Sequence, residues 1–332
     1  MKNSFFNLPL TGLFVFLVSL ISCYFLIFFL KKVKIVDTPN SRSNHVSLTP
    51  RGGGIAILFS LVIGVFFLNI EDISSIKGFI IPILSIIILS IVSFLDDMKG
   101  MSPLIRITLH FTTVSCTLVY CFNDFLFFYG YLSPVLDKIS IIIIWVYFIN
   151  AFNFMDGING ISFVETSTIT IGIYLLSLID TLPDVYGAYS FILFCAVSGF
   201  AYWNLIQGKI FLGDVGSVSL GFMLGGLLLK VYEQGFPFVA LILPLYYIAD
   251  TSITLLKRIF KKEKIWKAHS SHYYQIGYRG SQSLKKTLSI IAIGNLFLIF
   301  CALIFDNVIG YMAFPVVVFQ IYFLKKIGTI KE

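Results

Sequence analysis

The sequence predicts an all-α membrane protein with ten to eleven transmembrane helices, most simply eleven. Hydrophobic residues make up 58% of the 332 residues, and the mean hydropathy is +0.92. Charged residues make up only 12%, whereas a soluble domain carries roughly 25%. This composition excludes a soluble enzyme, a disordered chain and a nucleic-acid-binding module. The whole chain, 1–332, is therefore expected to form one integral-membrane domain.

Long apolar runs recur along the chain, and each predicts one helix that crosses the bilayer with its ends in the adjoining loops. The predicted spans are 8–30, 53–70, 79–95, 104–121, 139–152, 161–179, 185–203, 217–232, 236–256, 286–305 and 308–324. The first run is too long for the core of a signal peptide. Segment 122–136 mixes Asn, Asp, Gly and Pro with aromatic residues, which favours a hairpin at the membrane interface over another span.

Lysine and arginine fall unequally on the two sides of the predicted bundle. When the loop 31–52 is placed inside, 20 of the 24 basic residues lie on the inner side. Only Lys2, Lys77, Lys138 and Lys230 remain outside. The positive-inside rule therefore predicts an outer N-terminus and a cytoplasmic C-terminus. The polar motifs described next all fall in the predicted cytoplasmic loops.

The first cytoplasmic loop carries polar residues from Asp37 to His45, then Arg51 and three glycines that begin with Gly52. Glycines before a helix let backbone N–H groups approach a ligand closely, so this segment is a candidate phosphate cradle. The alternative is a flexible basic loop at the lipid headgroups.

Two adjacent carboxylates, Asp96 and Asp97, end the third apolar run, and Arg106 follows them. Neighbouring carboxylates repel one another, and a cation or a substrate proton relieves that repulsion. The alternative is a solvated helix terminus. Acids at a helix C-terminus oppose the helix dipole, which favours a functional role.

Asn150, Asn153 and Asp156 are spaced by three, so a helix would place them on one face. Three stacked polar residues within an apolar run exceed what a structural role needs. A further acid, Asp214, stands between glycines just before another apolar helix. It could bind a hard cation or a phosphate, or it could cap the helix.

The longest inside loop ends with His269 and His272, which are weak zinc ligands without a third soft partner. They could hydrogen-bond or pair with phosphate, and the nearby lysines could simply lie at anionic headgroups. The five cysteines are scattered without a CxxC pair, so neither a disulfide framework nor a zinc site is expected. Carboxylates and amides instead favour Mg²⁺, which implies phosphoryl transfer at the cytoplasmic interface with a lipid as one partner.

These loops, in this order, resemble the polyprenyl-phosphate N-acetylhexosamine-1-phosphate transferases of glycosyltransferase family 4. The motifs are Thr49-Pro-Arg-Gly-Gly, Asp96-Asp97, Asn153-x-x-Asp156-Gly, Gly213-Asp214-x-Gly-Ser217 and the late histidine loop. Each is weak alone, and together they cover most of the chain. The resemblance implies transfer of a sugar-1-phosphate from a UDP-sugar to undecaprenyl phosphate in a bacterial inner membrane, releasing UMP.

The resemblance also implies roles for single residues. Asp96 and Asp97 look like the catalytic pair, with Asp97 as the base on the lipid phosphate. Asp214, Asn153 and Asp156 would bind Mg²⁺, with Mn²⁺ as an alternative. The residues expected to contact substrate are His45, Arg51, Gly52, Arg106, Asn150, Asn159, Gly213, Ser217, His269 and His272. The oligomeric state stays open, a homodimer included.

Two departures from the family pattern bear on the substrate. Asn159 stands where the family often has a second aspartate, so no charged role is carried over to it. The late motif resembles the branch that initiates O-antigen synthesis more than the peptidoglycan branch, which argues against a muramyl-pentapeptide substrate. An ion-coupled transporter of a phosphorylated or sugar substrate is the competing class. Asp250 lies within an apolar run, so it either supports the site or is the one transporter-like residue.

Overall fold

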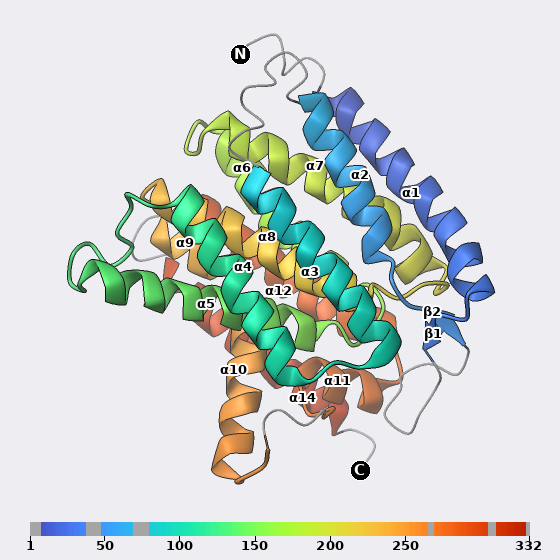
Figure 1. The fold of residues 1–332 in the computed structure, drawn as a ribbon. Helices are drawn as coiled ribbons and strands as arrows, with labels where there is room; N and C mark the ends of the chain where they lie inside the picture. The colour runs from blue at the N-terminus through green and yellow to red at the C-terminus, as the bar shows by residue number, and fades with distance from the viewer. Residues whose placement is uncertain (1–7, 38–47, 69–79, 265–268, 305–309, 330–332) are drawn as a thin grey trace.

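The computed structural model describes residues 8–37, 48–68, 80–264, 269–304 and 310–329. That part of the chain is a bundle of helices with one short pair of antiparallel strands, in which Val36 pairs with Pro50 and Asp37 with Thr49 (Figure 1). The predicted all-α membrane class is confirmed, because eight helices are long and apolar enough to cross a bilayer. The orientation stays a prediction.

The elements follow the predicted apolar runs closely. They are α1 (Leu8–Lys32), β1 (Val36–Asp37), β2 (Thr49–Pro50), α2 (Gly54–Leu68), α3 (Ile80–Lys99), α4 (Pro103–Cys121), α5 (Pro134–Met155), α6 (Ile161–Leu178), α7 (Asp184–Ala201), η3 (Tyr202–Ile206), α8 (Gly213–Glu233), α9 (Pro237–Ile242), α10 (Leu245–Phe260), α11 (Tyr273–Ser281), α12 (Leu284–Leu303) and α14 (Ala313–Gly328). Of the segment 122–136, predicted to form a hairpin, residues 122–133 are not helical, whereas 134–136 belong to the start of α5.

Eight of the eleven predicted spans correspond to the eight helices of the described residues that are long and apolar enough to cross a bilayer, and three do not. Two of them are shorter, because α2 has 15 residues and α14 has 16. The prediction of one continuous helix over 236–256 is wrong, since α9 ends at Ile242 and α10 begins at Leu245. Pro244 lies at the break, and proline lacks the N–H that a continuing helix would need.

Helix α8 lies at the centre of the bundle. Its span is 72% buried, whereas that of α3 is 17% buried. It packs against α2, α3, α5 and α9, while α1 packs on α2 and α7, and α6 packs on α7 and α12. Figure 1 shows the lower part of α10 extending away from the other helices. The start of α8 therefore meets the ends of several helices at one end of the bundle.

Candidate active site

The start of α2 is fixed against the segment that precedes α8. The N–H groups of Gly52 and Gly53 donate to the carbonyl of Phe211, and that of Gly54 donates to Leu212. A Cβ on Gly54 would lie 2.2 Å from the Cα of Gly216, so the two backbones could not approach this closely with larger residues. This contact places Arg51 beside the first turn of α8.

The same hydrogen bonds bear on the expected phosphate cradle. The three glycine N–H groups are donated to protein carbonyls, so they are not free to bind a phosphate in this arrangement. The glycines instead permit close packing of the α2 start on α8. Substrate contact by Gly52 stays a prediction.

Arg51 joins two carboxylates from different helices. Its Nε lies 3.1 Å from Oδ1 of Asp97, and its Nη2 lies 2.9 Å from Oδ1 of Asp214. Oδ2 of Asp97 also accepts the backbone N–H of Asp214 at 3.1 Å. That N–H follows Gly213, whose φ of +73° lies in the left-handed region that favours glycine. Asp97 is only 3% exposed, so Arg51 covers it from solvent.

Arg106 makes a second bridge on the other side of Asp214. Its Nη1 lies 2.9 Å from Oδ2 of Asp96 and 3.3 Å from Oδ2 of Asp214. Ser102 caps the start of α4 and Pro103 begins the helix, which orients the turn that carries Arg106. The structure thus brings both predicted aspartates of α3, both predicted arginines and Asp214 into one cluster.

A small cavity of about 20 Å³ lies behind this cluster, large enough for roughly one water molecule. Its polar lining consists of Ser93, Asp96, Arg106, His110, Asn150, Asn153 and Asp214. Asn153 Oδ1 accepts a hydrogen bond from the Ser217 hydroxyl at 2.6 Å. Asn150 donates to the Val146 carbonyl and lies 3.4 Å from Nδ1 of His110. Asn150 and Asn153, two of the three residues of the predicted face, therefore line the same cavity as Asp214, whereas Asp156 lies beyond the end of α5 and does not line it.

Asp156 lies immediately after α5 and is held by α6. Its Oδ1 accepts the Ser162 hydroxyl at 2.6 Å. Burial raises the pKa of Asp156 to about 6, and the negative charge of Asp214 adds to this, while Ser162 and Arg51 oppose it. Asp156 is therefore within electrostatic range of the cluster although no side-chain bond joins them.

Asn159 belongs to a separate hydrogen-bonded turn. Its Oδ1 accepts from Nδ2 of Asn204 at 3.4 Å, and Oδ1 of Asn204 accepts the N–H of Gly160 at 2.8 Å. Asn204 also donates to the Ile210 carbonyl, so it ties η3 to the start of α6. Asn204 both donates and accepts here, which requires an amide, whereas Asn159 only accepts through its Oδ1.

His269 and His272 form a second group of side chains, separate from the cluster of carboxylates and arginines. The rings of His269 and His272 stack with centroids 4.9 Å apart, and His272 is only 2% exposed. Burial lowers the pKa of His269 to about 4, with the charges of His272 and Arg258 in the same direction, so His269 is neutral at pH 7. The hydroxyl of Tyr274 donates to the Phe154 carbonyl, which connects this group to the segment carrying Asp156.

One predicted site residue is not described by the structure, and three residues near the site were not predicted from the sequence. His45 lies outside the described residues, so its predicted role stays a prediction. His110, Ser162 and Asn204 were not predicted. Only His110 had a usable signal, because it follows Arg106 by four residues and therefore shares its helix face.

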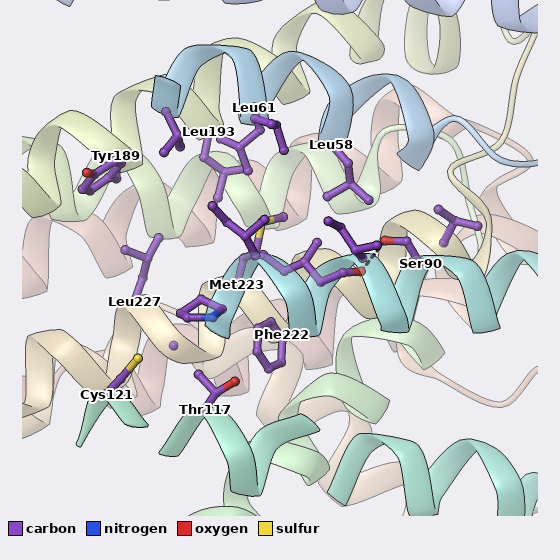
Figure 2. A pocket seen from close by; sticks show the side chains of 18 of the residues that line it. Leu58, Leu61, Ser90, Thr117, Cys121, Tyr189, Leu193, Phe222, Met223 and Leu227 are labelled. Carbon is purple, nitrogen blue, oxygen red and sulfur yellow. Dashed lines mark hydrogen bonds between the residues drawn. The ribbon is translucent and has the colours of Figure 1, made fainter. Parts of the chain in front are cut away.

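An apolar groove of about 1060 Å³ runs beside the cluster between α2 and α3, with α8 as its floor (Figure 2). Leu58, Leu61, Met223 and Leu227 line its middle. Ile55, Leu95 and Val215 also line it, and each lies within a few residues of a member of the charged cluster in the sequence. The groove could therefore hold a hydrocarbon chain next to the charged groups.

The donor chemistry suits a hard divalent cation. Four carboxylates, Asp96, Asp97, Asp156 and Asp214, face two guanidinium groups, so two formal negative charges remain if all are ionised. The described residues contain no group of three or more Asp, Glu, His or Cys side chains that could hold a metal by themselves. Mg²⁺ commonly takes one or two carboxylates and completes its shell with phosphate oxygens and water.

The chain is similar to known membrane transferases. Residues 79–232 match Glycosyl transferase family 4. The chain is 26% identical to a phospho-N-acetylmuramoyl-pentapeptide-transferase of Borrelia hermsii, over 83% of this chain and 90% of that protein. It is 25% identical to a probable undecaprenyl-phosphate N-acetylglucosaminyl 1-phosphate transferase of Bacillus subtilis, over 95% of this chain and 90% of that protein. The family match includes the segments that carry Asp97, Asp156 and Asp214.

Proposed function

The chain belongs to glycosyl transferase family 4, and from that premise we propose that it is a polyprenyl-phosphate sugar-phosphate transferase. It transfers a sugar-1-phosphate, an N-acetylhexosamine derivative, from a UDP-sugar to undecaprenyl phosphate. The products are undecaprenyl-diphosphate-sugar and UMP. The reaction takes place at the cytoplasmic face of a bacterial inner membrane and begins a surface polysaccharide such as O-antigen.

The observation that carries this proposal is the position of Arg51 between Asp97 and Asp214. Arginine binds phosphate through two parallel hydrogen bonds, and both its partners here are carboxylates suited to a metal or a proton. Arg106 repeats the arrangement with Asp96 and Asp214. A reaction between two anionic substrates requires fixed cations to bring them together and hard oxygen ligands to hold a metal ion.

In the proposed reaction, an oxygen of the lipid phosphate attacks the phosphorus that bears the sugar. The new P–O bond forms as the bond to the uridylyl phosphate breaks, and UMP leaves with that electron pair. Asp97 accepts the proton when the lipid phosphate arrives as a monoanion. A covalent intermediate on an aspartate is the alternative, since the same carboxylates could act as nucleophile.

Mg²⁺ belongs to the proposal, with Mn²⁺ as an alternative. Asp214 and Asn153 line the same small cavity, and Asp156 faces Asp214 electrostatically, so these three residues would hold the ion. When bound, the ion would neutralise charge on the diphosphate. Arg51 and Arg106 would orient the phosphates whether or not the ion is present.

The lipid substrate is supported by the membrane setting and by the apolar groove beside the cluster. The sugar rests on sequence alone. The late histidine motif favours a substrate of the O-antigen-initiating type, while the relatives include muramoyl-pentapeptide enzymes. Purified protein in detergent, with undecaprenyl phosphate and a panel of UDP-sugars, tests the proposal through UMP release. Release with one sugar of the panel supports it, and release with none rejects it.

The transporter alternative rested on Asp250 as an acid within the membrane. In the structure its carboxylate accepts hydrogen bonds from Tyr246, Thr254 and the residues that begin α11. An acid held by so many protein donors is not exposed to a permeating ion. The observation favours a supporting role for Asp250 in the site.

A further inference from the structure

Asp250 is completely buried in α10, yet its carboxylate is surrounded by hydrogen-bond donors. Two of them come from α10 itself, the hydroxyls of Tyr246 at 3.2 Å and Thr254 at 3.3 Å. Three come from the start of α11: the backbone N–H groups of Tyr273 at 3.0 Å and Tyr274 at 3.1 Å, and Nδ1 of His272 at 3.3 Å. Since all five groups can donate, the geometry suits an ionised, acceptor-only carboxylate.

The first N–H groups of a helix have no partner within the helix, and negative charge is favourable beside them. Asp250 supplies both the acceptor and the charge from another helix. It therefore fixes the position at which α11 begins, 22 to 24 residues further along the chain.

The same carboxylate determines the tautomer of His272. A carboxylate 3.3 Å from Nδ1 favours the tautomer that carries the proton of the neutral ring on Nδ1, which leaves Nε2 as the other functional atom. The rings of His269 and Tyr274 stack with the His272 ring, at centroid distances of 4.9 and 5.9 Å. Asp250 and the two neighbouring rings together hold the imidazole in one orientation.

The start of α11 is also connected to the carboxylate cluster. The Tyr274 hydroxyl donates to the Phe154 carbonyl at 3.0 Å, and a Cβ on Gly157 would lie 2.1 Å from that hydroxyl. Asp156 stands between these two residues. A displacement of the α11 start would therefore move the segment that carries Asp156.

We propose that Asp250 is a positioning residue for the transfer reaction, which holds the His272 ring so that Nε2 faces the nucleotide-sugar. The inference rests on the proposed function. Asp250 does not touch substrate in this account, and it acts through His272 and the start of α11. Loss of its charge should therefore affect the nucleotide-sugar more than the lipid phosphate.

The kinetic test compares Asp250→Asn, His272→Ala and the double variant, with Tyr246→Phe as the control. Tyr246→Phe removes one donor to the same carboxylate without touching α11. Asp250→Asn should raise KM for the UDP-sugar roughly tenfold or more, as loss of an orienting carboxylate does elsewhere, and change KM for the lipid phosphate less than about twofold. The double variant should be no worse than His272→Ala within about twofold, because the two residues act as one unit. An additive double variant, or an equal rise in both KM values, would overturn the proposal.

A second measurement does not need the reaction. Diethyl pyrocarbonate modifies accessible histidines, and mass spectrometry can follow each histidine separately. Asp250→Asn should speed modification of His272 several-fold while His110, 6% exposed, keeps its rate. If the wild-type protein releases no UMP, the proposed function has failed, and this measurement still decides the inference. An unchanged His272 rate, or a parallel rise at His110 from general unfolding, contradicts it.

Discussion

Arg51 and Asp214 are 163 residues apart in sequence, and their side chains meet at 2.9 Å between Nη2 and Oδ1. The contact depends on close backbone packing of Gly54 on Gly216, and it brings the segment that precedes α2 to the start of α8. Asp97 joins from the end of α3 through Nε of Arg51.

Replacement of Arg51 should lower turnover severely. Lysine keeps the charge but cannot bridge Asp97 and Asp214 together, so Arg51→Lys should recover little of the activity lost in Arg51→Ala. We expect kcat/KM to fall roughly a hundredfold in both, as when a buried charged partner is removed. The measurement is UMP release. Lys261→Ala, at an exposed lysine, is the control and should keep near-wild-type activity. Recovery by lysine to within a few-fold would reject a bridging role.

Asp214→Asn should change the metal requirement. A site with few protein ligands loses both affinity and turnover when one carboxylate becomes an amide. The Mg²⁺ titration of UMP release should shift to higher concentration, with a lower plateau. Asp184→Asn is the matched control, because Asp184 is an exposed acid in the first turn of another helix. Identical titrations for wild type and Asp214→Asn would rule out this residue as a ligand.

Asp156 should give a pH-dependent stability without any substrate. Burial raises its pKa in the folded protein from the ordinary aspartate value to about 6, so folding disfavours its ionised form. The contribution of Asp156 to the free energy of unfolding is therefore most favourable below about pH 4, declines as the pH rises from about 4 to about 6, and stays at its lowest value above about 6. In EDTA, Asp156→Asn should raise the apparent Tm at pH 7.5 and leave it unchanged near pH 4.

Added Mg²⁺ provides the control for this prediction. An ion at Asp156 would favour the ionised carboxylate. Saturating Mg²⁺ at pH 7.5 should therefore reduce or reverse the difference by which the apparent Tm of Asp156→Asn exceeds that of the wild type. A difference that is the same with and without Mg²⁺ would show that the ion binds elsewhere.

Asp97→Asn should lower turnover more than it changes either KM. A general base must be ionised, so wild-type activity falls on the acidic side of its pH profile, and this limb should flatten in the variant. Steady-state kinetics across pH, with both substrates varied, measure the effect. If Asp97→Asn keeps its turnover and raises only the KM for lipid phosphate, Asp97 binds the phosphate and is not the base.

The orientation can be tested by labelling single cysteines in intact cells. Ser271→Cys is exposed beside the late histidines, and Tyr131→Cys lies at a residue that is 90% exposed in the 122–133 segment. The positive-inside rule predicts that an impermeant thiol reagent reaches position 131 only. Exposed Cys116 should be replaced first. Labelling at position 271 would contradict the predicted orientation.

The sequence allowed most of the helices and the members of the charged cluster to be predicted. Apolar runs determine membrane helices almost by themselves, because every backbone group must be bonded within the bilayer. Charged residues at the ends of those runs, such as Asp97 and Arg106, then have to face each other at the membrane boundary. The break at Pro244 was not predicted, although proline was visible, because proline is tolerated within many membrane helices.

The hydrogen bonds that the sequence does not reveal join segments that are distant in the chain. Gly52 and its neighbours resemble a phosphate cradle until the carbonyls of Phe211 and Leu212 are seen to accept their N–H groups. The partners of Asp250 lie more than twenty residues away, so its role could not be read from its own helix. A pattern of residue types shows which groups are chemically useful, but only the packing shows which of their hydrogen bonds are already made.

The most direct test of the central claim follows the phosphorus atom. Purified protein is incubated with Mg²⁺, undecaprenyl phosphate and a UDP-sugar that carries ³²P in the phosphate next to the sugar. If the chain transfers a sugar-1-phosphate, the label moves into the organic phase in a one-to-one ratio with UMP released, and Asp97→Asn and Asp214→Asn largely abolish the movement. Label that stays in the aqueous phase as UDP while the sugar alone reaches the lipid, or that moves nowhere, would contradict the account.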